Sequence, residues 1–246
     1  MTGMKKTPQF YNKILGFPLY IGDRVRASHV TRLLNPNKEA ILLDAGCGNG
    51  VYSLEYVLRG AQVVGVDVSR KRIRQAHMAL RASGMIDQAS FVVADICNLP
   101  IRGSIFNKIS CVDVLEHIEN DFESASEIKR VLKSCGVLVV HVPQTCPSYT
   151  LLSSFDRKSS FKSLGHVREG YTFESLTELC DAVDLAIKTS EETFKKFAGL
   201  AWEINYRFRD SKISSILFPI LYSFSKLDFL SKGKGKGLLL VATKEL

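Results

Sequence analysis

Short apolar runs alternate with longer amphipathic stretches from Ala40 to Val142, and no other feature constrains the fold as strongly. The apolar runs are rich in β-branched residues and nearly continuous, which is typical of strands buried on both faces of a parallel sheet. The amphipathic stretches have helical periodicity, and the second of them opens at Ser69, a good N-cap, and closes at Gly84. We predict strands at 40–45, 62–67, 91–94, 108–113 and 136–142, with helices at 50–59, 70–83 and 122–133.

This order of strands and helices predicts a doubly wound, mostly parallel α/β sheet of the Rossmann-like kind, because each strand–helix–strand unit makes a right-handed crossover. A helix at 173–183 and strands at 185–194 and 238–243 bring the predicted sheet to seven strands. The segment 143–172 is rich in Ser, Pro and Gly and is predicted to be a loop. For 246 residues we expect a single domain over 1–246, with a helical cap at 10–34, a core at 40–194, a helical insertion or lid at 195–236 and the last strand at 237–246.

The net charge of +8 is concentrated at the two ends of the chain. Seven basic and two acidic residues give 1–40 a charge of +5, nine and three give 195–236 a charge of +6, and 16 and 19 leave 41–194 at −3. The N-terminal segment lacks the apolar region of a secretory signal, and no run reaches the roughly 20 apolar residues of a spanning helix. Six cysteines form no C-x-x-C pair, so we expect a reduced cytoplasmic protein.

The first predicted strand runs directly into a glycine-rich turn, Leu43-Asp-Ala-Gly-Cys-Gly-Asn-Gly50, and a helix comes after it. Glycines let the backbone turn tightly and approach a ligand, and a helix N-terminus offers unpaired N–H groups. Asp67 ends the second strand, where a carboxylate can accept both hydroxyls of a ribose. Asp95 and Asp113 lie at the ends of the third and fourth strands, so four successive strand ends each carry an acid. This pattern predicts a nucleotide-like ligand at the carboxyl edge of the sheet.

These residues resemble the class I S-adenosylmethionine-dependent methyltransferases, especially their small-molecule and lipid branch. The resemblance covers roughly 40–145, and the tail 237–244 is similar to the closing antiparallel strand of that fold. A nicotinamide-binding fingerprint fits less well, because its third glycine would stand at Val51. The resemblance implies that S-adenosyl-L-methionine is bound at its amino-acid end by Asp44 and the glycine loop, at its ribose by Asp67, at its adenine by Asp95 and Ile96, and near its methyl group by Asp113. The implied cofactor-binding residues are Asp44, Ala45, Gly46, Gly48, Gly50, Asp67, Val68, Asp95, Ile96 and Asp113.

The segment directly after the fourth strand narrows the class of methylated acceptor. Enzymes that methylate base amines carry N/D-P-P-Y/F there, whereas this chain has Asp-Val-Leu-Glu at 113–116. A pyrimidine C5 enzyme needs a cysteine after a proline, and the pair at 146–147 has the opposite order. Nucleic acid is therefore not the expected partner, although the basic ends keep an RNA or protein acceptor open as an alternative.

Two histidines are the candidate catalytic bases for a hydroxyl or an acidic carbon acceptor. His117 lies just past the fourth strand, and His166 lies in Gly-His-Val-Arg-Glu-Gly-Tyr at 165–171, which resembles the H-x-R-x-(x)-Y/F-(T/S) stretch beside the acceptor pocket in this branch. The alternative for His166 is that, with Arg168, it only holds a loop against the helix after strand four. The alternative for His117 is a structural role, because Glu-His at this position is frequent across enzymes of different chemistry.

The residues Asp113, Glu116 and His117 also resemble the E-x-x-E-H cluster that binds a divalent ion in some quinone-pathway O-methyltransferases. Asp113 is shorter than the first glutamate of that cluster. We therefore predict no metal ligands from the sequence.

The insertion at 195–236 contains an apolar stripe with helical spacing, surrounded by lysines. This composition is typical of an interfacial helix that contacts anionic lipid, and equally of a lid packed on the sheet with a solvated basic rim. Pro219 allows one kinked helix or two short ones. The stripe consists of Ile213, Ile216, Leu217, Ile220, Leu221, Phe224 and Leu227.

Together these features predict a methyltransferase that acts at oxygen or carbon of a small, apolar or lipid-like acceptor, in the cytoplasm and with peripheral membrane contact as an open possibility. A large apolar cover over the acceptor site argues for an apolar acceptor. A catalytically silent S-adenosylmethionine-binding protein is the remaining alternative, and the oligomeric state is left open.

Overall fold

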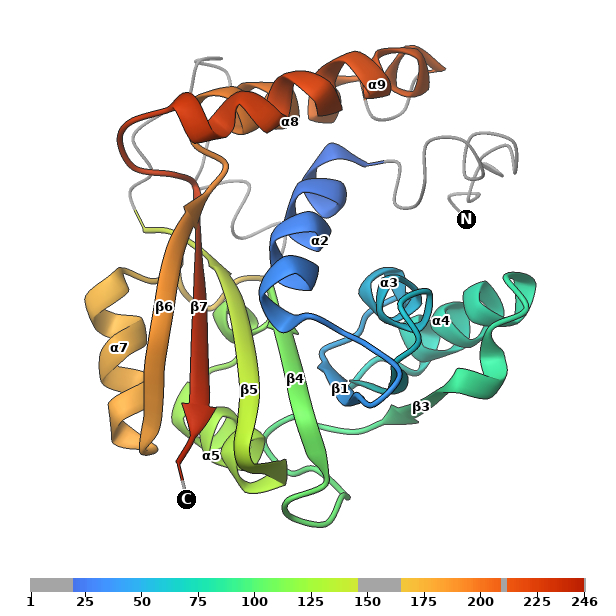
Figure 1. The fold of residues 1–246 in the computed structure, drawn as a ribbon, viewed down its shortest axis with the longest axis vertical. Helices are drawn as coiled ribbons and strands as arrows, with labels where there is room; N and C mark the ends of the chain where they lie inside the picture. The colour runs from blue at the N-terminus through green and yellow to red at the C-terminus, as the bar shows by residue number, and fades with distance from the viewer. Residues whose placement is uncertain (1–19, 146–164, 209–211, 246) are drawn as a thin grey trace.

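The computed structural model describes residues 20–145, 165–208 and 212–245, and these form a seven-stranded sheet with helices on both faces (Figure 1). The strand order is β3-β2-β1-β4-β5-β7-β6, in which β7 runs antiparallel to both of its neighbours. This confirms the predicted doubly wound, mostly parallel fold. The strands are β1 (Ile41–Ala45), β2 (Gln62–Asp67), β3 (Ala89–Val93), β4 (Phe106–Val112), β5 (Leu132–Pro143), β6 (Leu185–Thr193) and β7 (Gly237–Lys244).

Two apolar clusters fill the space between the sheet and its helices. The larger lies under α5 (Asp121–Val131) and α7 (Phe173–Ala182), and the second lies under α2 (Ile21–Leu34), α3 (Val51–Val57) and α4 (Arg70–Ala82). Nearly continuous apolar strands are required for this arrangement because both faces of the sheet are covered. The helices at 50–59, 70–83, 122–133 and 173–183 are thus confirmed, with ends shifted by one to a few residues.

Some predicted elements differ from the observed ones in their boundaries, and others lie partly outside the described residues. Strand β5 begins at Leu132, earlier than predicted, through an irregular section in which Cys135 has a φ of 59°. The predicted cap at 10–34 is helical from Ile21, whereas 10–19 lies outside the described residues. Of the predicted loop 143–172, residues 146–164 also lie outside them.

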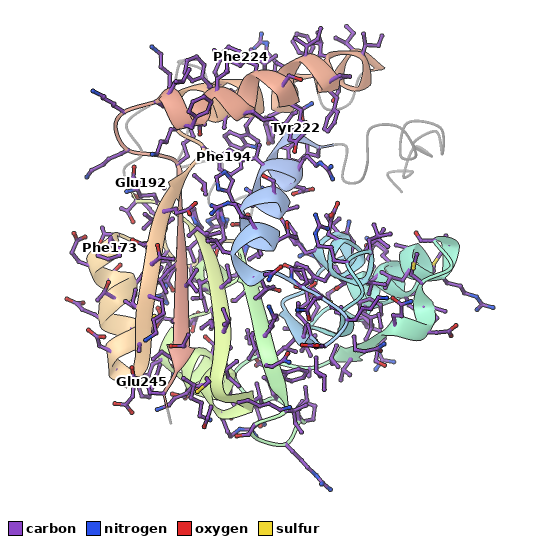
Figure 2. The ribbon with its side chains drawn as sticks, in the orientation of Figure 1. Phe173, Glu192, Phe194, Tyr222, Phe224 and Glu245 are labelled. Atoms are coloured by element: carbon purple, nitrogen blue, oxygen red, sulfur yellow. The ribbon has the colours of Figure 1, made fainter. Side chains whose placement is uncertain are left out.

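The insertion forms a helical layer, which we call the roof, above α2 and the upper end of the sheet (Figure 1). It consists of α8 (Lys196–Arg207), α9 (Lys212–Ser225) and the short 3-10 helix η3 (Lys226–Leu230). Helix α9 continues through Pro219, so the insertion is not divided at the proline. A third apolar cluster joins the roof to α2, and Figure 2 shows Phe194, at the end of β6, beneath Phe224. No helix in the described ranges is long and apolar enough to cross a bilayer.

The roof cluster provides a stability test within one helix. Phe218 is 1% exposed in that cluster, whereas Ile216, two residues before it, is 68% exposed. We expect Phe218→Ala to lower the free energy of unfolding by about 3 kcal/mol or more, because the cavity adds to the lost burial. Ile216→Ala should change it by less than about 0.5 kcal/mol. Urea unfolding of both variants measures the difference, and equal effects would contradict the described orientation of α9.

Candidate active site

The glycine turn after β1 has the geometry that its sequence predicts. Gly46 and Gly50 have φ values of 75° and 80°, in the left-handed region that disfavours other residues. A Cβ at Gly46 would lie 2.3 Å from a methyl carbon of Val114, and one at Gly50 would lie 2.9 Å from the Cβ of Ala76. The glycines therefore let the turn pass close to the end of β4 and to α4.

The centre of the same turn is anchored on one side and open on the other. The N–H of Gly48 donates to Oδ2 of Asp67 at 3.0 Å, and the N–H of Ser69 donates to Oδ1 of Asp67 at 2.8 Å. A Cβ at Gly48 would meet only Nη1 of Arg72 within 4 Å, at 3.8 Å. Backbone that lies open beside a helix N-terminus and a carboxylate is a suitable cradle for a nucleotide-like ligand.

The four acids lie along one edge of the sheet, as their strands require. Strands β3, β2, β1 and β4 are direct neighbours in that order, so Asp95, Asp67, Asp44 and Asp113 form a row at the carboxyl ends. Asp95 is exposed and accepts the N–H of Cys97, while the next residue, Ile96, is buried. Val68 is exposed next to Asp67. The predicted ribose and adenine residues thus lie together, and their contacts with a cofactor remain predictions.

Asp44 differs from the other acids of the row because it is 1% exposed. The hydroxyl of Ser53 donates to its Oδ2 at 2.5 Å, and that of Ser110 donates to its Oδ1 at 3.1 Å. Burial raises the pKa of Asp44 to about 6, against the opposite effect of these two hydrogen bonds. The carboxyl group thus supports the glycine turn from inside the protein, and its predicted contact with the cofactor's amino-acid end is untested.

Asp113 is the centre of a charged network at the end of β4. Its Oδ2 lies 2.7 Å from Nε of Arg26 on α2, and its Oδ1 lies 2.6 Å from Nδ1 of His141 on β5. Nε2 of His141 in turn lies 2.9 Å from the hydroxyl of Thr193 on β6. Burial alone would raise the pKa of Asp113, but Arg26 and His141 outweigh it and lower the pKa to about 2. Asp113 is therefore a fixed anion that joins α2, β4 and β5.

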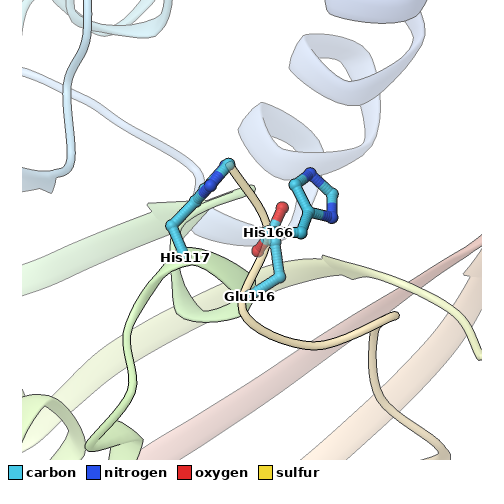
Figure 3. A group of neighbouring side chains, drawn as sticks. All are labelled: Glu116, His117 and His166. Atoms are coloured by element: carbon cyan, nitrogen blue, oxygen red, sulfur yellow. The ribbon is translucent and has the colours of Figure 1, made fainter. Parts of the chain in front are cut away.

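A second group forms next to this network from Glu116, His117 and His166, whose candidate ligand atoms all lie within 4.8 Å of one another (Figure 3). The two imidazole rings meet edge to face at 4.6 Å, and Nδ1 of His117 lies 3.1 Å from the carbonyl oxygen of Gly165. Glu116 is 1% exposed, and its Oε2 has no hydrogen-bond partner in the described structure. Burial and the nearby Asp113 raise the pKa of Glu116.

The two histidines predicted from the sequence are therefore brought together, and Asp113 is not part of their group. Burial and the neighbouring His117 lower the pKa of His166, which leaves a neutral imidazole able to accept a proton. A carboxylate and two imidazoles are also donors that a divalent ion could use. Asp113 is committed to Arg26 and His141, so the E-x-x-E-H arrangement is not reproduced.

Arg168 has the structural role that the sequence left open. Its guanidinium donates to the carbonyl oxygens of Ile118 and Glu119 at 2.8 and 2.9 Å and pairs with Asp121. The N–H of Val167 donates to the carbonyl oxygen of Glu116 at 2.9 Å. These bonds hold the 165–171 segment over η2 (Leu115–His117), which positions His166 above Glu116.

Sequence reasoning missed Arg26 and His141. Arg26 lies in a helix that was predicted only as a cap. His141 lies within an apolar strand, whose sequence pattern indicates only a buried strand. A histidine inside such a strand, one strand away from an acidic strand end, was the available signal.

The sheet order, the open glycine turn and the row of acids define a Rossmann-like fold of the class I methyltransferase type. Residues 43–140 match the family model described as "Methyltransferase domain".

Relatives with similar sequences are named as methyltransferases of several acceptors. A ubiquinone biosynthesis O-methyltransferase of Chromobacterium violaceum is 35% identical over 100 residues, which are 40% of this chain and 39% of that protein. One from Nitrosomonas europaea is 28% identical over 120 residues, or 48% and 50% of the two chains. A sterol 4-C-methyltransferase of Caenorhabditis elegans is 27% identical over 148 residues, or 60% and 43%. The chain spans about half the length of the relatives it matches.

Solved structures share the fold over nearly the whole chain. Phosphoethanolamine N-methyltransferase 2 of Haemonchus contortus, in complex with S-adenosyl-L-methionine, has a TM-score of 0.69 at 19% identity and covers 96% of this chain and 56% of its own. A geranyl diphosphate methyltransferase in complex with SAM has a TM-score of 0.68 at 15% identity, covering 98% and 93%. At these identities the likeness establishes the fold.

The buried Asp44 gives a pH dependence of stability that can be measured. Its pKa is raised from 3.8 to about 6 in the folded protein, so the folded state binds a proton that the unfolded state has lost between these values. The contribution of this group to the free energy of unfolding therefore falls by about 3 kcal/mol as the pH rises from about 4 to about 6. Above that pH its contribution is constant. Asp44→Asn removes this loss. The free energy of unfolding of the variant should therefore rise relative to that of the natural protein as the pH increases across this interval.

Urea unfolding at several pH values tests this, with Asp181→Asn, at an exposed position, as the charge-matched control. A stability difference between the Asp44→Asn variant and the natural protein that does not change with pH would contradict the burial of this carboxyl group.

Proposed function

We propose that the protein is an S-adenosylmethionine-dependent methyltransferase that moves a methyl group to oxygen or carbon of a small, apolar or lipid-like acceptor. The observation that carries this proposal is the open backbone of Gly48 beside Asp67, within a row of acids on adjacent strands. When bound, S-adenosyl-L-methionine supplies an electrophilic methyl group on a sulfonium. The chain's own residues bind it, orient the acceptor and accept the proton.

Each part of the cofactor would have a matching element on this edge. The glycine turn and the start of α3 would receive the amino-acid end, Asp67 the ribose hydroxyls, and Asp95 with Ile96 the adenine. Arg26 adds a half-buried cation beside Asp113, and a guanidinium is well suited to a carboxylate such as that of the methionine portion. This would place the methyl group near the ends of β4 and α2.

Proton removal fits the group formed by Glu116, His117 and His166. Alignment of acceptor oxygen, methyl carbon and sulfur supplies most of the rate effect in such a displacement. As the oxygen–carbon bond forms and the carbon–sulfur bond breaks, the hydroxyl proton would pass to the neutral imidazole of His166. Arg168 keeps the segment that carries His166 in place, and His117 packs against its ring.

The roof favours an apolar acceptor. A series of neighbouring rings extends from the network at Asp113 towards the roof. The ring centres of His141 and Phe194 are 6.3 Å apart, and those of Phe194 and Trp202 are 6.4 Å apart. The ring centre of Tyr206 lies 5.8 Å from that of Trp202. Aromatic side chains bind flat apolar groups over a large area. Relatives named for ubiquinone biosynthesis and for sterol methylation support the same class of acceptor.

We extend the proposal to the source of the acceptor: a lipid-like molecule would reach the enzyme from an anionic membrane that residues 195–236 contact peripherally. The basic charge of this insertion supports such a contact.

Two alternatives have distinct outcomes. An enzyme acting on RNA or protein would bind a polyanion with strong salt dependence through the basic ends. The fold alone does not establish methyl transfer, because a structure named as the [4+2]-cyclase SpnF has a TM-score of 0.66 at 20% identity. A silent binding protein would bind S-adenosylmethionine without turnover on any acceptor.

Cofactor binding is tested at Asp67. We expect Asp67→Asn to weaken the binding of S-adenosylhomocysteine by at least about tenfold, because an amide replaces a charged acceptor of the ribose hydroxyls and of the Gly48 N–H. Isothermal titration calorimetry measures the change. Asp87→Asn, an exposed aspartate on η1 (Ile86–Gln88), should bind as tightly as the natural protein. Equal affinity of the Asp67 and Asp87 variants would refute the assigned site.

The base is tested at His166. We expect His166→Asn to lower kcat by about a hundredfold or more while S-adenosylhomocysteine binding is unchanged, because general-base catalysis contributes about this factor. Release of S-adenosylhomocysteine with a panel of polyprenylated phenols and sterols as acceptors is the measurement.

His77→Asn, on the exposed face of α4, is the control and should keep the natural kcat. Turnover that survives EDTA separates proton transfer from a divalent ion held by the same three side chains. An unchanged kcat in the His166 variant would show that another group removes the proton.

A further inference from the structure

We infer that the outward face of the roof is a docking surface for an anionic lipid bilayer. This inference rests on the proposed function, because membrane contact would bring the enzyme to a lipid-like acceptor. The contact itself can be measured without turnover. We call this surface the docking face, and it consists of Ile213, Ile216 and Ile220 on α9 with Leu227, Phe229 and Leu230 on η3.

The first argument is the exposure of large apolar side chains. Ile216 and Ile220 are 68% and 67% exposed, and Phe229 is 79% exposed. Ile213, Ile216 and Ile220 are spaced by three and four residues, so they share one side of α9. Clusters of large apolar side chains on a surface indicate an interaction site, whereas single ones need no explanation.

The second argument is that α9 already has a packed side. Phe218 and Leu221 are buried in the cluster that joins the roof to α2. The helix is thus apolar on two sides, and only one of them is needed to hold it on the protein. An ordinary lid helix would present polar residues outward, so the isoleucines of the outward side are unexplained by the fold.

The third argument is charge, which selects a bilayer over another apolar partner. Both acidic side chains in the described part of the insertion are used internally. Asp228 accepts the N–H groups of Lys195, Phe197 and Ala198 at 2.8 to 3.0 Å, and Glu203 is buried in a pair with Lys236. The exposed charged side chains of that part are all basic: Lys196, Arg207, Lys226, Lys232 and Lys234.

Apolar side chains that insert below the headgroups, bordered by lysines that stay at their level, match the two components of an anionic membrane surface. Inside η3, Asp228 turns inward while its neighbours Leu227 and Phe229 are exposed, which keeps the acid away from the proposed lipid contact. Each added basic residue near such a surface strengthens binding and makes it sensitive to salt.

The test is flotation of the full chain with vesicles of phosphatidylcholine alone and of phosphatidylcholine with about one third phosphatidylglycerol. The natural protein should bind the anionic vesicles in a salt-sensitive manner and the neutral ones more weakly. The double variant Ile216→Ser and Ile220→Ser should reduce the partition coefficient on the order of tenfold or more, because two inserted side chains are lost. Phe229→Ser with Leu230→Ser tests the η3 part independently.

The matched control is Leu58→Ser with Met78→Ser, which removes two exposed apolar side chains from the end of α3 and from α4. It should bind vesicles as the natural protein does. Lys226→Glu with Lys232→Glu should abolish the preference for the anionic vesicles. Unfolding midpoints verify that the substitutions leave the fold intact.

S-adenosylhomocysteine binding, measured on the same proteins, separates this inference from the proposed function. Loss of vesicle binding with normal cofactor binding supports the docking face, and absence of cofactor binding in every protein overturns the methyltransferase proposal alone. The docking face is overturned if the natural protein does not float with anionic vesicles or if the serine variants float equally well. It is also overturned if light scattering shows a dimer that the serine variants lose, since a second copy would then cover this face.

Discussion

The ion pair between Arg26 and Asp113 is the interaction on which the described site depends. A half-buried carboxylate without a countercharge is unfavourable, and Asp113 also has a φ of 52° at the end of its strand. Arg26 supplies the charge from α2, and His141 supplies the second partner from β5. The guanidinium of Arg26 also lies 5.1 Å from the ring centre of Phe194, below the roof. One arginine therefore connects the edge of the sheet, helix α2 and Phe194 below the roof.

Helix α2 gains its fixed position from further contacts of the same kind. Nη1 of Arg24 lies 2.9 Å from Oε1 of Glu55 on α3, and Nη2 of Arg32 lies 2.5 Å from Oε2 of Glu191 on β6. At its N-terminus, the N–H of Ile21 donates to the amide oxygen of Asn205 on α8 at 3.2 Å. The basic charge of the N-terminal segment is thus partly consumed in holding α2 to the core. In the roof the described acids are used internally, and the exposed charged side chains are basic.

Sequence reasoning was successful where local chemistry decides the structure. The glycine turn was predictable because φ values such as those of Gly46 and Gly50 exclude other residues, and the row of acids because parallel strands end at one edge. The closeness of His117 and His166 could not be derived from their spacing in the sequence. His117 contacts the carbonyl oxygen of Gly165, the residue before His166, across a sequence separation of 48. It depends on Arg168, whose partners Ile118, Glu119 and Asp121 are distant in sequence. The same holds for Arg26, which finds Asp113 only when α2 packs on the finished sheet.

The insertion shows why periodicity alone left two interpretations open. A lid helix and an interfacial helix have the same sequence pattern when each has one apolar side, and the stripe from Ile213 to Leu227 fits either. In the structure the stripe divides: Leu221 packs inward, with Phe218 beside it, and Ile216 and Ile220 face outward. The two interpretations are therefore not exclusive, because opposite sides of α9 can serve each of them. A helix that closes the acceptor site with one side and contacts lipid with the other would give an apolar acceptor a short path from the bilayer to the enzyme.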